Sequence, residues 1–104
     1  WVSPQTAIDE HERGTLRLPP PTVVSLQDLT HQTSVAQILN AAASRVPPYF
    51  FPKVCAQAGK NAVMLYPGDA GYQDANPQAI GERHRAQWSD GVIAYERSYE
   101  YSSL

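Results

Sequence analysis

The run Pro19-Pro20-Pro21 most constrains what this chain can fold into. Three consecutive prolines fix their own φ angles and lack backbone N–H groups, so they fit neither a central strand nor a helix interior. We therefore expect residues 16–22 to form a stiff, extended segment. This segment separates a short N-terminal stretch from the rest of the chain.

Helix signals lie on both sides of the prolines. Ser3-Pro4 is typical of a helix start and Gly14 of a helix end, which predicts a helix over about residues 4–13. After the prolines, apolar residues recur at every third position, which predicts a second helix capped by Thr22 or Ser25. These apolar residues are Val23, Leu26 and Leu29.

A third helix follows directly. Ser34 and Gln37 match the capping box, in which each side chain bonds the other residue's backbone N–H group. The apolar stripe behind them predicts a helix to about Arg45, where Val46-Pro47-Pro48 ends it. The first 46 residues are thus predicted to be helical.

Strand patterns dominate residues 47–104. The runs 53–58 and 61–66 flank Gly59-Lys60, and the runs 83–88 and 92–97 flank Ser89-Asp90-Gly91. Asp-Gly between two alternating runs is a strong hairpin signal. We expect an α+β fold with three N-terminal helices followed by two antiparallel β-hairpins, packed as a single unit over residues 1–104.

Composition excludes several classes of function. Eight Lys and Arg residues face ten Asp and Glu residues, which argues against a nucleic-acid binder that works by neutralising phosphates. No apolar run approaches the roughly 20 residues that span a bilayer. Cys55 is the one cysteine, so an internal disulfide is excluded. We expect a cytoplasmic protein that binds neither nucleic acid nor membrane.

No residue pattern predicts a catalytic or metal site. Asp9, Glu10 and Glu12, with His11 among them, point to different sides of a helix, and a solvated face explains them better than a metal site. The run Gly68-Asp69-Ala70-Gly71 lacks the lysine of a phosphate loop and is interpreted as a turn. Cys55 has no evident base beside it and is interpreted as a buried strand residue.

The densest basic run is Arg83-His84-Arg85. On a strand the two arginines share one face, where they are able to hold a phosphate through charge-assisted hydrogen bonds. The alternative is an exposed strand whose long side chains extend to solvent, and we favour this alternative.

Several phrases of the sequence resemble the C-terminal part of Nudix hydrolases, in the bacterial branch similar to coenzyme A and nucleoside-diphosphate pyrophosphatases. The matching residues are Trp1-Val2-Ser3-Pro4, Ala7, Gly14, Leu16 to Leu18, Pro20-Pro21-Thr22, Leu26, Leu29, Ser34-Val35, Met64 to Tyr72 and Arg83-His84-Arg85. The resemblance implies that the chain forms part of an α/β/α sandwich. It also implies a parent enzyme that cleaves a diphosphate linkage with magnesium or manganese.

The chain departs from that family in the motif that defines it. The Nudix box contains an Arg-Glu pair and a Glu-Glu pair whose glutamates bind the metal. Neither dipeptide occurs here. We expect the box to lie N-terminal to Trp1, so that this chain holds no catalytic residue, metal ligand or cofactor and is inactive alone. The resemblance places Pro20, Pro21 and Thr22 near the substrate, and Arg83 and Arg85 complete the candidate substrate-binding residues.

A second hypothesis belongs to a different class. The chain is then a stand-alone interaction domain, whose contact surface is the proline- and aromatic-rich segment 47–52. The partner is the missing N-terminal half under the first hypothesis, and another protein or a second copy under the second. The first hypothesis predicts exposed apolar surface on Trp1 and on a helix face, whereas the second predicts that this surface is covered.

Overall fold

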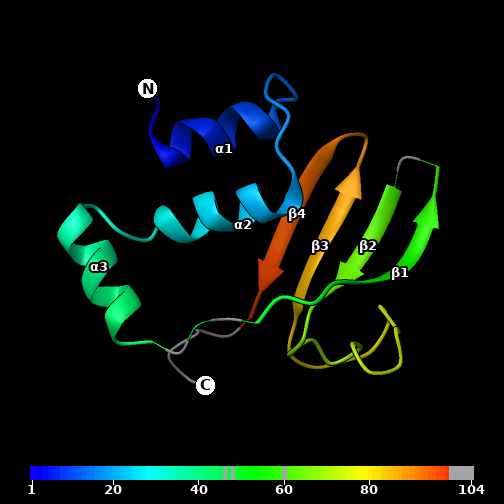
Figure 1. Cartoon of the computed structure of the whole chain (residues 1–104). Coiled ribbons are helices and arrows are strands. Elements are labelled where there is room, and N and C mark those ends of the chain that lie inside the picture. Colours follow the sequence, from blue (N-terminus) through cyan, green and yellow to red (C-terminus); the bar gives the residue numbers. More distant parts are fainter. Residues whose placement is uncertain (46, 48, 60, 99–104) are drawn as a thin grey trace.

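The computed structural model describes residues 1–45, 47, 49–59 and 61–98, and it confirms the α+β prediction (Figure 1). Three helices precede four strands. The helices are α1 (Pro4–Glu12), α2 (Pro20–Leu29) and α3 (Val35–Ala43), and the strands are β1 (Lys53–Ala58), β2 (Asn61–Leu65), β3 (His84–Ser89) and β4 (Val92–Arg97). The two predicted hairpins join into one antiparallel sheet in the order β1-β2-β3-β4.

Helix α1 starts and ends where its sequence signals predict. The Ser3 hydroxyl accepts a hydrogen bond from the Thr6 N–H group at 3.1 Å, and Pro4 opens the first turn. Gly14 follows the helix with a φ of +79°, a conformation that glycine adopts at little cost. The three-residue link from there to Arg17 brings the chain to the proline run.

The expectation for the proline run is wrong in one respect. Only Pro19 is extended, whereas Pro20 and Pro21 form the first turn of α2, and no side chain caps this helix. The predicted caps, Thr22 and Ser25, lie inside the helix. The first-turn N–H groups of a helix have no intrahelical partner, so proline loses nothing there and its fixed φ suits the helix.

Helix α3 starts at the predicted cap. The Ser34 hydroxyl accepts from the Gln37 N–H group at 3.2 Å, while the Gln37 side chain accepts from the Thr33 N–H group at 2.9 Å, one residue earlier than the capping box requires. No residue of α3 is buried. Figure 1 shows α3 standing apart from the sheet and from the other two helices.

Each hairpin has a short turn, whereas a long loop connects the first hairpin to the second. Asp90 and Gly91 have φ angles of +49° and +84°, as the predicted two-residue turn requires. A loop of residues 66–83 joins β2 to β3. Strand β1 carries a bulge between Val54 and Ala56, which falls at Cys55.

The core lies between the sheet and helices α1 and α2. Ile8 from α1 and Val23 and Val24 from α2 pack with Ala86, Ile93 and Tyr95 of the sheet. These two helices therefore cover the half of the sheet formed by β3 and β4. Within the part of the chain that is described, no helix combines the length and apolar character needed to cross a membrane.

Candidate functional site

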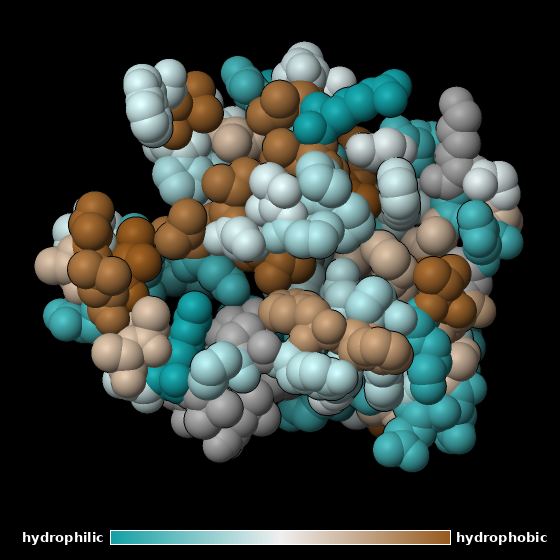
Figure 2. All heavy atoms as spheres, in the orientation of Figure 1, coloured by the Kyte–Doolittle hydropathy of each residue, from teal (hydrophilic) through white to brown (hydrophobic). Residues whose placement is uncertain are grey.

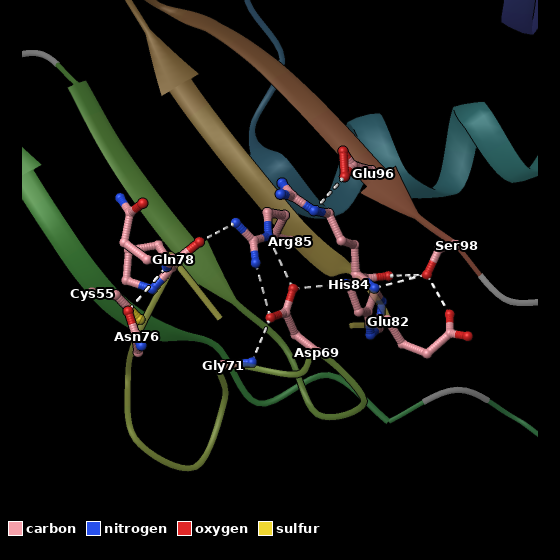
Figure 3. Close-up of polar contacts among 12 residues, drawn as sticks. Cys55, Asp69, Gly71, Asn76, Gln78, Glu82, His84, Arg85, Glu96 and Ser98 are labelled. Carbon is pink, nitrogen blue, oxygen red and sulfur yellow. Dashed lines mark hydrogen bonds and ion pairs between the residues drawn. The ribbon is translucent and has the colours of Figure 1, made fainter. Parts of the chain in front are cut away.

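A buried carboxylate and a buried guanidinium pair on the face of the sheet opposite the helices (Figure 3). Arg85 Nε donates to Asp69 Oδ2 at 2.9 Å, and Arg85 Nη2 donates to Asp69 Oδ1 at 3.0 Å. The third nitrogen, Nη1, donates to the Pro77 carbonyl at 2.9 Å. All three guanidinium nitrogens of Arg85 thus bond to protein oxygens.

Asp69 also accepts two backbone hydrogen bonds. The Gly71 N–H group donates to it at 2.9 Å and the His84 N–H group at 2.8 Å. Burial alone raises the pKa of the Asp69 carboxyl, but the bonds from Arg85, His84 and Gly71 outweigh burial and hold the pKa below its ordinary value of 3.8. The carboxylate therefore stays ionised and ties the 66–83 loop to β3.

The loop that carries Asp69 is tightly closed. Ala70 N–H donates to the Glu82 carbonyl at 2.7 Å. A Cβ atom on Gly71 would stand 1.9 Å from the Asn76 carbonyl oxygen, so only glycine fits at this position. The predicted turn at residues 68–71 is confirmed, and its aspartate is an ion-pair partner rather than part of a phosphate loop.

A second buried network lies on the helix side of the sheet. His84 Nδ1 is 2.8 Å from the Pro67 carbonyl, and Nε2 is 2.7 Å from the Tyr95 hydroxyl. Because a carbonyl only accepts, Nδ1 carries the proton and Nε2 accepts from Tyr95. The Tyr95 hydroxyl in turn accepts from Arg97, which pairs with Asp28 of α2 at 3.0 Å.

Two side chains bind helices α1 and α2 to the outer edge of β4. His11 Nε2 accepts from the Ile93 N–H group at 2.8 Å, and its Nδ1 donates to the Leu16 carbonyl at 2.9 Å. Gln27 donates to the Tyr95 carbonyl at 3.2 Å. The solvated-face interpretation is therefore wrong for His11, which is 1% exposed and closes a sheet edge.

The exposed-strand interpretation of the basic run holds for Arg83 alone. The Arg83 side chain is 44% exposed and lies 3.5 Å from Glu96. His84 and Arg85 are buried, contrary to that interpretation. The reason is the 66–83 loop, which folds back over β3 and supplies both Pro67 and Asp69 as partners.

The five candidate substrate-binding residues do not form one site. Pro20, Pro21 and Thr22 lie in the first turn of α2, whose Val23 and Val24 pack on the helix side of the sheet. Arg85 alternates with the buried Ala86 and so occupies the opposite face. The sheet separates the prolines from the arginines.

The concave regions of the described surface include two grooves and a smaller hollow. A groove of about 660 Å³ between the proline run and the tip of the β1–β2 hairpin is lined by Leu18, Pro19, Ala62 and Trp88, among others, and stops short of Pro20. A groove of about 460 Å³ lies between α1, α2 and β4. The third, of about 230 Å³, lies on the β1–β2–β3 strands.

The described residues contain no group of three His, Cys, Asp or Glu side chains placed to hold a metal ion. Cys55 is half-buried, and its thiol donates to the Lys53 carbonyl at 3.2 Å. Among the residues that the structure describes, every buried side-chain nitrogen and oxygen has a hydrogen-bond partner. The Asp69–Arg85 and His84–Tyr95–Arg97 networks therefore have a structural role: they neutralise buried charge and connect the helices and the 66–83 loop to the sheet.

Sequence reasoning missed both networks. The single available signal was strand alternation, which places His84 and Arg85 on opposite faces of β3. Their partners are distant in sequence: Arg97 reaches Asp28 across 69 positions, and Arg85 reaches Asp69 across 16.

Comparison of the chain with family models, with curated proteins and with solved structures gives no match.

Proposed function

We propose that this chain is the non-catalytic C-terminal part of a metal-dependent hydrolase of the Nudix type, whose parent cleaves a diphosphate linkage with magnesium or manganese. The observation that carries the proposal is unpaired apolar surface at the sites where the resemblance predicts a missing neighbour. Trp1 is fully exposed, and Val35 and Leu39 on α3 are 72% and 64% exposed. Figure 2 shows apolar side chains gathered on the surface over α3.

The composition of helix α3 indicates that it packs against a neighbour and does not face solvent. Its sequence is apolar except for Gln37 and Asn40, and it carries no charge. A helix of this composition is normally buried, because its apolar surface gains about 25 cal/mol per Å² removed from water. The missing half of the enzyme is the proposed neighbour.

The first test reads the codons directly upstream of Trp1 in the same frame. A Gly, Arg-Glu and Glu-Glu pattern on an amphipathic helix supports the proposal, and a stop codon there contradicts it. The longer chain is then assayed with magnesium on ADP-ribose and coenzyme A. Hydrolysis by the longer chain, with none by residues 1–104, is the expected result.

Charged substitutions on α3 make the test specific. Val35→Glu with Leu39→Glu is expected to leave residues 1–104 folded but to destabilise the longer chain, since glutamate cannot be buried unpaired. Asn40→Glu adds charge to the same helix at an exposed polar position and serves as the matched control. Equal stability of the two longer variants contradicts the packing role of α3.

The interaction-domain hypothesis keeps one observation in its favour. Tyr49 and Phe51 in the predicted contact segment are 67% and 60% exposed. Pro48 of that segment lies outside the described residues. A concentration-dependent change in the molecular mass of residues 1–104, lost in Phe51→Ala, would favour this second function.

A further inference from the structure

We propose that the groove between the proline run and the hairpin tips binds a neutral sugar, one ring of which lies on the indole of Trp88. The groove has a volume of about 660 Å³, and three segments line it: the link between α1 and α2, the β1–β2 hairpin and the β3–β4 hairpin. Figure 1 shows both hairpins ending at the same end of the sheet as this link. The inference does not depend on the proposed hydrolase, because it involves neither α3 nor a metal.

The floor of the groove is an aromatic platform on the helix side of the sheet. Trp88 is two residues beyond the buried Ala86 of β3 and therefore shares its face. Strand pairing places Trp88 between Ala62 of β2 and Ile93 of β4. The helices cover Ile93, which is 3% exposed, but leave Trp88 41% exposed. Because Ala62 has a single methyl group and also lines the groove, the indole has no large neighbour on β2.

One wall of the groove is aliphatic and firmly held. Leu18 is partly buried and packs against the core between the helices and the sheet. Pro19 is extended and directly precedes the first turn of α2. Since this backbone is fixed before a ligand arrives, little order has to be created on binding. Among the described residues that line the groove, Trp88 is the one aromatic ring.

Four polar side chains surround the platform. They are exposed and come from all three segments: Arg17, Gln57, Asn61 and Asp90. Within the described part of the chain, none of the four side chains has a hydrogen bond or an ion pair to another residue. Water is therefore their partner, and a ligand that reproduces those hydrogen bonds is able to replace it.

The bonding capacity of these side chains selects the class of ligand. Arg17 only donates, Asp90 only accepts, and the amides of Gln57 and Asn61 do both. One positive and one negative charge offset each other, which favours an uncharged ligand. A hydroxyl group donates and accepts at once, so it is able to bond to any of the four. A sugar ring carries hydroxyls around its edge and C–H groups on its face, and the electron-rich face of an indole attracts such C–H groups.

A nucleotide fits the groove less well, although its base is able to stack on Trp88. Its phosphates require cations, and Arg17, the cation that lines the groove, is offset by Asp90. The net charge of −2 argues in the same direction for a nucleic-acid strand. A neutral sugar satisfies the platform and the polar edge without such a requirement.

The test titrates the whole chain with the methyl β-glycosides of glucose, galactose and mannose and follows the two indole N–H signals by NMR. At least one glycoside is expected to move the Trp88 signal with a Kd of about 1 mM, the scale for a ligand of this size. The signal of Trp1, which is fully exposed and far from any proposed contact, is expected to stay in place. Sorbitol has the hydroxyls but no ring face, and is expected to move neither signal.

Three variants locate the site, with binding measured on the amide signals of Asn61 and Gly91. Trp88→Ala is expected to weaken binding by at least about tenfold. Asp90→Asn keeps a residue that tolerates the positive φ of this turn but removes the carboxylate, and is expected to weaken binding by about fivefold. Gln87→Ala removes an exposed amide from the opposite face of β3 and serves as the matched control, with no expected effect.

Three outcomes overturn the sugar site. The first is that no glycoside moves the Trp88 signal, or that Trp1 or sorbitol responds equally. The second is binding that neither Trp88→Ala nor Asp90→Asn weakens. The third is a response of Trp88 to adenosine, a neutral nucleoside, with none to the three glycosides, which would assign the groove to a flat base.

Discussion

Helices α2 and α3 follow one another in the chain, yet they relate to the fold in opposite ways. In α2, Val23 and Val24 are buried against the sheet, and Asp28 and Gln27 bond to β4. Helix α3 is the more apolar of the two and buries no residue. Apolar composition alone therefore does not attach a helix, and attachment here combines a facing surface with polar bonds to it.

The same contrast applies to α1. Its sequence is mostly polar, but Ala7, Ile8 and His11 are buried. A few well-placed side chains hold α1, while a full apolar face on α3 stays in solvent. The anchored region, defined as α1, α2, the sheet and the 66–83 loop, is thus distinct from α3, and substitutions in the two regions are expected to differ in cost.

The largest effect is expected at the buried ion pair of the anchored region. Arg85→Met removes the guanidinium that pairs with Asp69 and leaves a buried carboxylate, so the free energy of unfolding should fall by about 3–5 kcal/mol. The matched control is Arg83→Met, which breaks an exposed pair with Glu96 and should cost about 0–1 kcal/mol. Urea denaturation measures both, and equal losses contradict this ranking.

The second prediction compares the two regions directly. Ile8→Ala removes core volume between α1 and the sheet and should cost about 2–5 kcal/mol of unfolding free energy. Leu39→Ala removes a similar side chain from the exposed face of α3 and should stay within about 0.5 kcal/mol. A large loss for Leu39→Ala in residues 1–104 would mean that α3 is packed in solution, by self-association or otherwise.

Sequence patterns predicted most of the elements because their signals are local. The Ser3 and Ser34 caps, the glycine after α1 and the Asp90-Gly91 turn each act within a few residues, and each is confirmed. The predicted start of α2 was wrong because all three prolines were excluded from the helix, as they would be from a helix interior. Proline is excluded from the interior but suits the first turn.

The polar networks could not be predicted in the same way. A strand pattern shows that His84 and Arg85 face opposite sides, but it does not show that one loop will cover both. That outcome depends on the close approach of Gly71 to Asn76, which closes the loop and brings Asp69 to β3. Whether α3 would find a facing surface is likewise a property of the whole fold and not of its own sequence.

The third prediction concerns the attachment of α1. His11→Ala leaves the Ile93 N–H group and the Leu16 carbonyl without their partner, and the free energy of unfolding should fall by about 1–3 kcal/mol. His31 is an exposed histidine just beyond α2, and His31→Ala should change the unfolding free energy by less than about 0.5 kcal/mol. Hydrogen exchange should also accelerate at the Ile93 amide in the His11 variant alone. Unchanged exchange there would show that α1 does not close the edge of β4.

The smallest effect needs no substitution, because it follows from the pKa of His84. Burial lowers this pKa from its ordinary value of 6.5, and the charge of Arg97 acts in the same direction, against the Pro67 carbonyl, Asp69 and Asp28. The unfolded chain therefore binds more protons than the folded chain between the lowered pKa and about 6.5.

It follows that the contribution of neutral His84 to stability is fully present above about pH 6.5 and is lost as the pH falls through the lowered pKa. Protonation of His84 Nε2 also removes the acceptor for the Tyr95 hydroxyl, so the hydrogen bond between His84 of β3 and Tyr95 of β4 is lost. An NMR titration of the His84 ring should give a pKa below 6.5, and His84→Gln should flatten the decline of stability between pH 7 and pH 5. A His84 pKa at or above 6.5 would place this ring in a wetter environment than the anchored region provides. In that case the difference in stability between the anchored region and α3 would come from apolar packing and from the Asp69–Arg85 pair, and not from His84.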